Sequence, residues 1–448
     1  MRPALPGFRE FYPPECALRN AIFATFRRVV RRFGFEEFDG PTLEPLELFT
    51  DKSGPEIASQ LFHFADRGGR AVALRPEMTP TLARMVGARA AGLRRPIRWS
   101  NVGEAFRYER PQKGRLRSFY QMNADLLGEE DAAADGELVV LLLSILEEFG
   151  LTVNDFYLRV SDRQLWSLFL GSFGLADSAI GQVLSAIDKV EREGEEETKK
   201  KLGEIFHGNV AQLWAGIAAL RSCNGTDDLR KFFSSTSLRE ATEKRLTDWD
   251  RLLECVASAG FSAHVAVDMT VVRGLAYYTG FVFEAFERGE KGRALAGGGR
   301  YDDLVEKLSG TPLAATGFAI GDVTLANLLV EKGLISDTSQ QPIAFVLMED
   351  AVRQAGLALV HGLRKKDLSV LWDLADNRSL ARQMGRADRS GAAFALSIGV
   401  EEVAGDFVTV RSMASGAVER VARAEVGDWL ARHGAVRLSP SLPSSSSS

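Results

Sequence analysis

The stretch "FRYERPQKGRLRSFYQ", residues 106–121, decides how the rest of this sequence is interpreted. It places four arginines and one lysine within sixteen positions of a chain whose formal net charge is −5. The polar segment "PQKG" lies in its middle, between two segments that are rich in aromatic residues. This pattern predicts two long strands over residues 98–127, joined by a polar turn, with cationic side chains at one end of a sheet face.

Alternate residues of the second predicted strand share a face. One face carries Arg115, Arg117, Phe119, Gln121, Asn123 and Asp125, and the other carries Leu116, Tyr120, Met122 and Leu126. From Phe119 to Asp125 the strand spans about 20 Å, roughly the length of a nucleotide joined to an amino acid. Guanidinium groups bind phosphate, an aromatic ring stacks on a base, and a carboxylate accepts hydrogen bonds. An ordinary exposed basic hairpin has the same pattern, so both interpretations stay open at this point.

Length and composition limit the class of protein. A chain of 448 residues predicts two or three domains, and 45% hydrophobic with 26% charged residues is typical of a soluble globular protein. The net negative charge argues against indiscriminate coating of nucleic acid but allows a local basic patch. Three cysteines without metal-ligand spacing indicate a reducing cytoplasm, and we expect no signal peptide, no membrane span and no metal site of the protein's own.

The hydrophobic pattern divides the chain into five parts. A helix is predicted over residues 15–33, and a strand, a sharp turn and a helix that starts at Thr79 over "RAVALRPEMTPTLARMV". We expect a core in two parts (1–163 and 253–334), a helical insertion between them (164–252), a small α/β domain with a mostly parallel sheet (342–437) and a disordered tail (438–448). The charge run "VEREGEEETKKKLGEIF" is interpreted as a solvated helix face.

The hairpin resembles the second signature motif of class II aminoacyl-tRNA synthetases, in the form found in histidyl-tRNA synthetases. Other segments resemble further parts of that family in the same order: "GFEEFDGPTLEPLELF", "LRPEMTPTLAR", "VVRGLAYYTGFVFEAF", "AGGGRYDDLVEKL", "GFAIGDVTLANLL" and "SLARQMGRADRSGAAFALSIG". The resemblance covers nearly the whole chain. It implies an α+β fold: a class II antiparallel sheet flanked by helices, a helical insertion, and a small C-terminal α/β domain that binds the anticodon.

The resemblance also implies a reaction. Histidine and ATP, bound with Mg²⁺, form histidyl-adenylate, and histidine is then transferred to tRNA(His). Arg107 grips the α-phosphate, where charge develops during the attack, and Arg273 reaches the same phosphate beside it. The implied ATP-binding set is Arg107, Glu109, Arg115 and Phe119: Glu109 accepts from the adenine amino group, Arg115 meets the terminal phosphates and Phe119 stacks on the base. Arg107 and Arg273 are the implied catalytic residues.

The implied histidine-binding residues are Glu77, Thr79, Gln121, Asp125, Arg273, Tyr277 and Tyr278. Glu77 and Thr79 bind the ammonium group, Asp125 accepts from an imidazole N–H, and Tyr278 offers its hydroxyl to the same ring. A site that hydrogen-bonds the imidazole in this way rejects apolar amino acids. Tyr301 lines the same pocket, and the glycines of "AGGGRYD" let the backbone pass close to histidine; a phosphate-binding loop is the weaker interpretation of that segment.

Arg273 has a second interpretation, because a strand arginine often forms a structural ion pair. In the C-terminal domain, the basic residues Arg378, Arg382, Arg386 and Arg389 are candidates for contact with the anticodon, or in part for solvated helix charges. Class II motif 1 segments pair across a two-fold axis, so the resemblance implies a cytoplasmic homodimer without membrane contact.

The chain departs from the family pattern at two places. Ala276 follows "RGL", where an acidic residue is common, and "GDVTL" replaces the usual "GLERL" of motif 3. Thr324 therefore stands where an arginine touches ATP, a charge-assisted contact of about 1.5–3 kcal/mol. Arg115 or Lys113 are candidates to replace it. Two rival functions follow: a histidine-sensing regulatory subunit of histidine biosynthesis, which typically lacks the C-terminal domain and ATP-binding arginines, and a module that senses uncharged tRNA.

Overall fold

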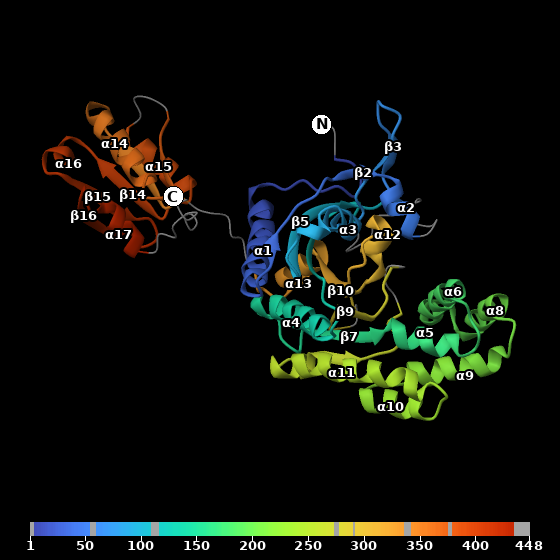
Figure 1. The fold of residues 1–448 in the computed structure, drawn as a ribbon. Coiled ribbons are helices and arrows are strands. Elements are labelled where there is room, and N and C mark those ends of the chain that lie inside the picture. The colour runs from blue at the N-terminus through green and yellow to red at the C-terminus, as the bar shows by residue number, and fades with distance from the viewer. Residues whose placement is uncertain are drawn as a thin grey trace. The chain divides into compact units, whose positions relative to one another are not determined.

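The computed structural model describes residues 4–53, 60–108, 116–272, 277–289, 292–335, 342–374 and 379–433 (Figure 1). They belong to two compact units, Met1–Thr338 and Ser339–Ser448. Each unit has its own cluster of buried hydrophobic side chains. Separate cores are what separate domains require, because each must bury its own apolar surface.

An eight-stranded sheet forms the centre of the first unit, in the order β1-β5-β6-β11-β10-β9-β7-β8. Its strands are β1 (Glu36–Glu37), β5 (Ile97–Phe106), β6 (Ser118–Leu127), β7 (Phe156–Asp162), β8 (Val265–Val267), β9 (Phe281–Glu287), β10 (Ala294–Arg300) and β11 (Ala315–Gly321). The edge pairs β1–β5 and β7–β8 are parallel, and the five inner pairs are antiparallel. Strands β5 and β6 pair from Phe106–Ser118 to Ile97–Leu127, which confirms the predicted hairpin.

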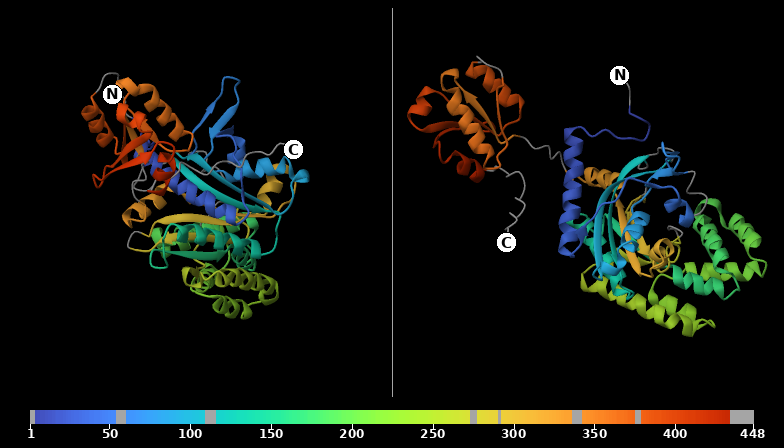
Figure 2. Two further views of the ribbon diagram at one scale, coloured as in Figure 1. Left: turned by 90° about the vertical axis from the view of Figure 1, so that its left-hand side faces the viewer. Right: turned by 45° about the horizontal axis from the view of Figure 1, so that its top comes forward.

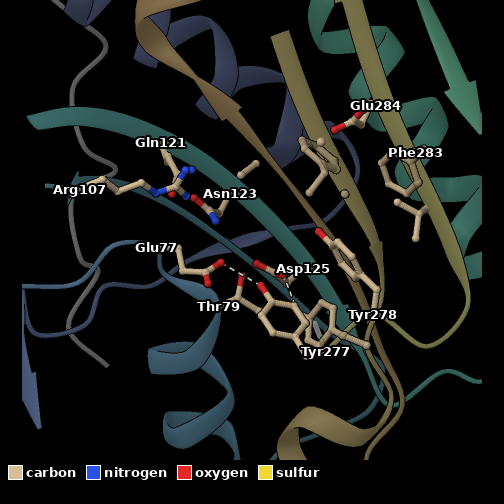
Figure 3. A pocket seen from close by; sticks show the side chains of 17 residues that line it. Glu77, Thr79, Arg107, Gln121, Asn123, Asp125, Tyr277, Tyr278, Phe283 and Glu284 are labelled. Carbon is tan, nitrogen blue, oxygen red and sulfur yellow. Dashed lines mark hydrogen bonds between the residues drawn. The ribbon is translucent and has the colours of Figure 1, made fainter. Parts of the chain in front are cut away.

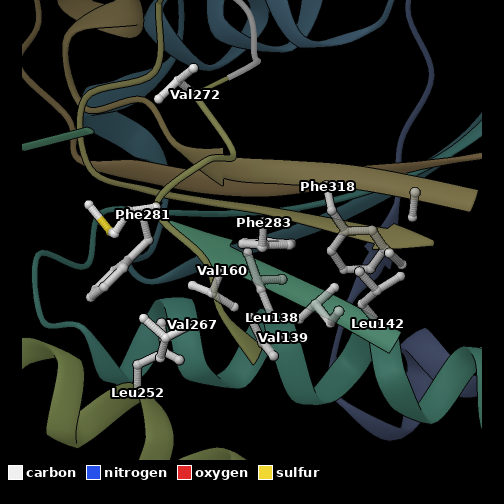
Figure 4. Close-up of a cluster of buried hydrophobic side chains, with 14 of the residues drawn as sticks. Leu138, Val139, Leu142, Val160, Leu252, Val267, Val272, Phe281, Phe283 and Phe318 are labelled. Carbon is white, nitrogen blue, oxygen red and sulfur yellow. The ribbon is translucent and has the colours of Figure 1, made fainter. Parts of the chain in front are cut away.

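Helices cover one face of this sheet. They are α1 (Pro13–Arg32), α4 (Ala133–Glu148) and α13 (Asp322–Glu331). Met122 and Leu126 of β6 are buried in the core between the sheet and these helices. Phe283 of β9 is buried there too, close to Leu138 and the other apolar side chains of α4 (Figure 4). The even-numbered side chains of β6 thus pack into the core, and its odd-numbered side chains point to the opposite face of the sheet.

A second, three-stranded sheet is formed by residues in the N-terminal part of the first unit, in the order β2-β4-β3. Its elements and neighbours are β2 (Leu43–Pro45), α2 (Glu47–Ser53), β3 (His63–Ala65), β4 (Ala71–Leu74), α3 (Thr79–Gly87), a 3-10 turn (Ala90–Gly92) and α12 (Asp303–Ser309). Helix α3 begins at Thr79 as predicted, with Pro80 in its first turn, where the missing N–H costs nothing.

The chain between β7 and β8 is helical. Its elements are α5 (Arg163–Gly171), α6 (Asp177–Asp188), α7 (Val190–Glu193), α8 (Glu195–Ile205), α9 (Val210–Arg221), α10 (Thr226–Ser234), α11 (Arg239–Ser258) and a 3-10 turn (Ser262–His264). Figure 2 shows these green helices gathered beside the sheet. Asp162 caps α5 through the N–H groups of Gln164 and Leu165 and also pairs with Arg245 at 2.6 Å, which joins α11 to this entry point. Within the described ranges, no helix is long and apolar enough to cross a membrane.

The second unit is a five-stranded sheet with helices, in the strand order β13-β12-β14-β15-β16. Its elements are β12 (Ala344–Met348), a 3-10 turn (Asp350–Val352), α14 (Arg353–Arg364), β13 (Val370–Trp372), α15 (Leu380–Arg389), β14 (Phe394–Ile398), α16 (Val400–Ala404), β15 (Phe407–Ser412), β16 (Val418–Ala422) and α17 (Val426–Arg432). The expected mostly parallel sheet is wrong, since only two of the four pairings are parallel. One reason is that β15 pairs with β14 in the antiparallel sense. The other is β16, an exposed strand whose "VERVA" sequence is too polar to stand out.

Candidate active site

The open face of the sheet carries the polar residues of β6. Phe119, Gln121, Asn123 and Asp125 line two adjoining cavities, while Met122 on the opposite face is fully buried in the core. The predicted division of this strand into a site face and a core face is therefore confirmed. Leu116 was expected on the core face but lines a cavity beside Phe119. It precedes the first residue of β6, so the strand alternation does not yet apply to it.

The first cavity has a volume of ≈ 270 Å³ and gathers residues from distant parts of the sequence. Its polar walls come from the start of α3, from β6 and from the aromatic residues near β9 and β10: Glu77, Thr79, Arg107, Gln121, Asn123, Asp125, Tyr277, Tyr278, Glu284 and Tyr301 (Figure 3). Every described residue of the histidine-binding set predicted from the sequence lies on this wall. Gly297 and Gly298 of β10 also line it, and their close approach to a bound histidine stays a prediction.

Two tyrosines hold the two carboxylates of this cavity. Tyr301 donates its hydroxyl to Oδ1 of Asp125 at 2.6 Å, and Tyr277 donates to Oε2 of Glu77 at 2.8 Å. The buried Oδ2 atom of Asp125 has no hydrogen-bond partner in the described part of the chain, nor do Oε1 of Gln121 and Oδ1 of Asn123. Buried polar atoms normally have partners, so three orphaned acceptors in one cavity call for a ligand rich in N–H donors.

Burial controls the charge state of both carboxyl groups. It raises the pKa of Asp125 to about 7; the hydrogen bond from Tyr301 opposes this shift and the charge of Glu77 adds to it. Burial also raises the pKa of Glu77, against the lowering effects of Arg107 and of the hydrogen bond from Tyr277. Two desolvated carboxyl groups in one cavity favour a cationic ligand, because a positive charge would offset the cost of ionising them.

The second cavity, of ≈ 320 Å³, shares five wall residues with the first: Arg107, Gln121, Glu284, Gly297 and Ala319. Its remaining wall is mostly apolar and includes Phe119 and Leu295. The Arg107 guanidinium carbon lies 5.3 Å from the centre of the Phe119 ring, and its Nε donates to the carbonyl oxygen of Pro76 at 3.2 Å. An aromatic ring beside a cation can hold a flat base and its phosphate.

Val323 and Thr324, the motif 3 departures, line this second cavity beside Phe119. The preceding residue, Asp322, faces away from the cavity, since its carboxylate accepts from the Tyr120 N–H at 2.8 Å and pairs with Arg9 at 2.7 Å. The departures therefore change the wall of the cavity itself.

Several predicted residues lie outside the described ranges, namely Arg273, Glu109, Arg115 and Ala276, together with Lys113 and Arg378. Their roles stay predictions. In the second unit, Arg386 pairs with Asp373 at 2.7 Å, so this arginine forms an ion pair within the unit.

Glu284 is the wall residue that the sequence did not reveal. Its strand, β9, was predicted, but nothing in "GFVFEAF" marks this glutamate among the many exposed acidic residues. Tyr301 was placed in the pocket from the sequence, but its bond to Asp125 was not.

The fold and the site together define a class II aminoacyl-tRNA synthetase. The sequence profile of the histidyl-tRNA synthetase family matches residues 7–325, and that of an anticodon binding domain matches residues 340–433. The chain belongs to the histidyl-tRNA synthetase family. The fold class predicted from the sequence is thereby confirmed.

Relatives of known sequence and structure cover the chain almost from end to end. A protein named histidine–tRNA ligase from Opitutus terrae is 47% identical over 424 residues, which are 94% of this chain and 96% of the relative. One of the same name from Haloarcula marismortui is 37% identical over 93% and 94% of the two chains. The crystal structure of histidyl-tRNA synthetase from a Nostoc species matches with a TM-score of 0.79 at 25% identity, over 97% of this chain and 100% of that one.

Proposed function

We propose that this protein is a histidine–tRNA ligase, which activates histidine with ATP to histidyl-adenylate and transfers it to tRNA(His). The observation that carries this proposal is the junction of two cavities of different chemistry. One offers buried acceptor oxygens, and the other offers an aromatic ring with a guanidinium group. A histidine in the first cavity would extend its carboxylate toward the α-phosphate of an ATP in the second.

Histidine matches the first cavity group by group. Its ammonium group has three N–H donors for Glu77 and Thr79, and Tyr277 fixes the Glu77 carboxylate for that contact. One imidazole N–H would be accepted by the orphaned Oδ2 of Asp125, and the Tyr278 hydroxyl would donate to the other ring nitrogen. An apolar amino acid would leave these buried groups unpaired, at about 1–3 kcal/mol for each.

Activation needs charge neutralisation rather than a nucleophile on the enzyme. A histidine carboxylate oxygen attacks the α-phosphorus, and pyrophosphate leaves with the electron pair of the broken P–O bond. Arg107 is the one basic side chain among the described residues that lines both cavities, so it is placed to stabilise charge on the α-phosphate. Phe119 stacks on adenine. Glu109, Arg115 and Arg273 complete the ATP site by the family resemblance.

ATP enters as its Mg²⁺ complex. Mg²⁺ prefers phosphate and carboxylate oxygens and keeps several waters, so the ATP phosphates supply most of its ligands. Among the described residues, no group of three or more His, Cys, Asp or Glu side chains is arranged to hold a metal ion by itself. Mg²⁺ thus enters as part of the substrate, and it adds to the neutralisation of phosphate charge that Arg107 supplies.

We also propose a cytoplasmic homodimer whose C-terminal unit contacts the tRNA anticodon. The match of residues 340–433 to an anticodon binding domain supports the second part. The exposed edge strand β1, in the motif 1 segment, supports pairing between two copies. The three cysteines are free, which suits a reducing compartment.

Histidine-dependent exchange of pyrophosphate into ATP tests the proposal. Purified protein with Mg²⁺ should exchange pyrophosphate with histidine and not with leucine or phenylalanine, and it should charge tRNA(His). Exchange that is absent with histidine would refute the ligase and favour a regulatory or tRNA-sensing protein built on the same fold. Exchange without charging would locate the failure in the transfer step.

A further inference from the structure

The backbone pairing between β6 and β11 ends one residue short of Asp322. Gly321 and Gln121 are the last pair, so an unbroken strand would next place residue 322 opposite Tyr120. The chain instead turns into α13 at Asp322, and its carboxylate takes the place of the missing backbone acceptor, since Oδ1 accepts from the Tyr120 N–H at 2.8 Å. The Asp322 side chain therefore extends the pairing of the two segments by one hydrogen bond.

This hydrogen bond joins two segments of the wall of the second cavity. Phe119 and Gln121, on either side of Tyr120, line that cavity, and so do the two residues that follow Asp322. The Cα atoms of neighbouring residues are only about 3.8 Å apart, so a fixed contact between Tyr120 and Asp322 also fixes the separation of the wall residues beside them.

Arg9 binds the other oxygen of the same carboxylate. Its Nη2 atom lies 2.7 Å from Oδ2 of Asp322, whose side chain is 4% exposed, against 25% for that of Arg9. Burial raises the pKa of Asp322, and the charge and the hydrogen bond of Arg9 oppose this shift. Without Arg9, a buried carboxylate would lose its cation, which favours a persistent pair.

The segment that carries this arginine, residues 7–11, runs along the start of β6; we call it the N-terminal strap. At one end, the carbonyl oxygen of Gly7 accepts from the N–H of Arg117 at 2.9 Å. At the other end, the ring of Phe11 packs edge-on against that of Tyr120, with centres 6.1 Å apart. Both ends of the strap are thus fixed to β6 or to the residue just before it.

Asp322 is itself one of the departures from the family pattern. The segment "GDVTL" differs from "GLERL" at three positions, and Asp322 stands where that pattern has leucine. The resemblance places an arginine that touches ATP at position 324, and this chain has Thr324 there. A wall that is fixed before the ligand arrives needs less ordering on binding, so a rigid cavity can offset part of a lost contact.

We propose that Arg9 and Asp322 are positioning residues for ATP, which act through the Tyr120 N–H on the wall of the second cavity. Neither Arg9 nor Asp322 lines that cavity, so both act through other residues. This inference rests on the proposed ligase function and adds a pair through which the N-terminal strap sets the affinity for ATP. The carboxylates of the histidine cavity are held by tyrosines instead, so histidine binding should depend little on this pair.

The two KM values in pyrophosphate exchange test the pair. Arg9→Ala should raise the KM for ATP about fivefold to twentyfold and leave the KM for histidine within about twofold of the parent. Arg9→Lys should restore part of the loss, because it keeps a cation near Asp322. The matched control is Arg28→Ala, which removes an arginine of α1 that pairs with Glu148 at 2.9 Å and lines neither cavity; it should change neither KM.

The route through Asp322 predicts that the two substitutions are not additive. Asp322→Ala should raise the KM for ATP at least as much as Arg9→Ala, because it also leaves the Tyr120 N–H without its acceptor. The double variant should match Asp322→Ala within about twofold, since Arg9 has then lost the group on which it acts. If the two increases multiply instead, Arg9 acts independently of Asp322 and the inference is wrong.

Hydrogen–deuterium exchange of backbone amides separates positioning from a general loss of structure. In Asp322→Ala, residues 118–121 should exchange deuterium faster than in the parent while β9 and β10 keep the parental rate, and saturating ATP with Mg²⁺ should slow residues 118–121 again. A parental KM for ATP in both single variants would overturn the inference. Equal increases in both KM values, with faster deuterium exchange throughout, would overturn it too. A parent that exchanges no pyrophosphate would instead refute the ligase function itself.

Discussion

In the proposed histidine site, selectivity would rest on a few buried oxygen atoms. Tyr301 binds one oxygen of Asp125 and leaves the other buried and without a partner. Each unpaired group costs about 1–3 kcal/mol until a ligand donor reaches it. A histidine N–H that reaches this oxygen would offset that cost, and any amino acid that lacks an N–H at this position should bind more weakly.

Asp125 should make histidine binding depend on pH. Burial raises its pKa to about 7, and only the ionised carboxylate accepts an imidazole N–H at full strength. The KM for histidine should therefore fall as pH rises from 6 to 8. In Asp125→Asn we expect a KM about tenfold higher at pH 8 and a flatter profile, from pyrophosphate exchange across this range. A parental profile in the variant would contradict the role.

The same group should affect stability in the opposite sense. Because its folded pKa lies above the ordinary 3.8, the protonated carboxyl stabilises the free protein. That contribution is present in full below pH 4 and is lost as pH rises through about 7. Thermal unfolding without histidine should show a smaller decline between pH 5 and 8 in Asp125→Asn than in the parent. An identical decline would mean that Asp125 is ionised throughout.

Gly317 should be irreplaceable beside Asp125. A Cβ atom at this position would lie 1.9 Å from Oδ1 of Asp125, and the carboxylate is held there by Tyr301. Gly317→Ala must therefore displace the carboxylate, and the KM for histidine should rise at least about tenfold. The KM for ATP serves as the internal control and should stay within twofold. A parental KM for histidine would show that Asp125 can move without consequence.

Part of the candidate site could be predicted from the sequence. Gln121 and Asp125 were placed on one face because strand alternation is a local rule. The contact between Tyr301 and Asp125 joins residues 176 positions apart, and no spacing rule predicts such a pair. Glu284 was missed for the same reason, since only the folded sheet brings it to the walls of the cavities that Arg107 also lines.

At the scale of elements, the wall of the second cavity, the proposed ATP site, comes from the hairpin β5–β6, from β9, β10 and β11, and from the start of α13. Phe119 comes from β6 and Thr324 from the first turn of α13, because β11 runs beside β6 and ends at Gly321 opposite Gln121. Alternation and the polar turn predicted this hairpin from the sequence. The short exposed strand β16 was not predicted, because its polar residues give no hydrophobic signal.

Thr324 can be used to test the motif 3 departure. Thr324→Arg places a cation on the wall that Phe119 shares, and a charge-assisted hydrogen bond to a phosphate is worth about 1.5–3 kcal/mol. The KM for ATP in pyrophosphate exchange should fall about tenfold. Thr324→Met, which adds length without charge, should not lower it. An unchanged KM in Thr324→Arg would indicate that another cation already occupies that place.

At the scale of the whole molecule, the residues matched by the synthetase profile and those matched by the anticodon binding profile lie in separate units. Each unit has a separate core, so removal of one need not unfold the other. The split between them was predicted from the linker and from the change in strand and helix pattern. The helical region 164–252 was expected to fold over the acceptor arm of the tRNA, and this stays a prediction.

Deletion of residues 339–448 should keep pyrophosphate exchange and weaken charging. The remaining unit contains both proposed substrate cavities, whereas the domain that matches the anticodon binding profile is removed. We expect exchange within about threefold of the parent, a KM for tRNA at least about tenfold higher, and a shallower dependence of that KM on salt, since fewer phosphate contacts remain. An unchanged KM for tRNA would show that the second unit does not bind it.

The most direct test of the account is a crystal structure with a non-hydrolysable histidyl-adenylate analogue. We predict an imidazole N–H within about 3 Å of Oδ2 of Asp125, adenine stacked on Phe119, and the α-phosphate mimic against Arg107 and Arg273. An imidazole outside the cavity of Tyr277, Tyr278 and Tyr301, or an Arg273 side chain on the opposite face of the sheet, would contradict it.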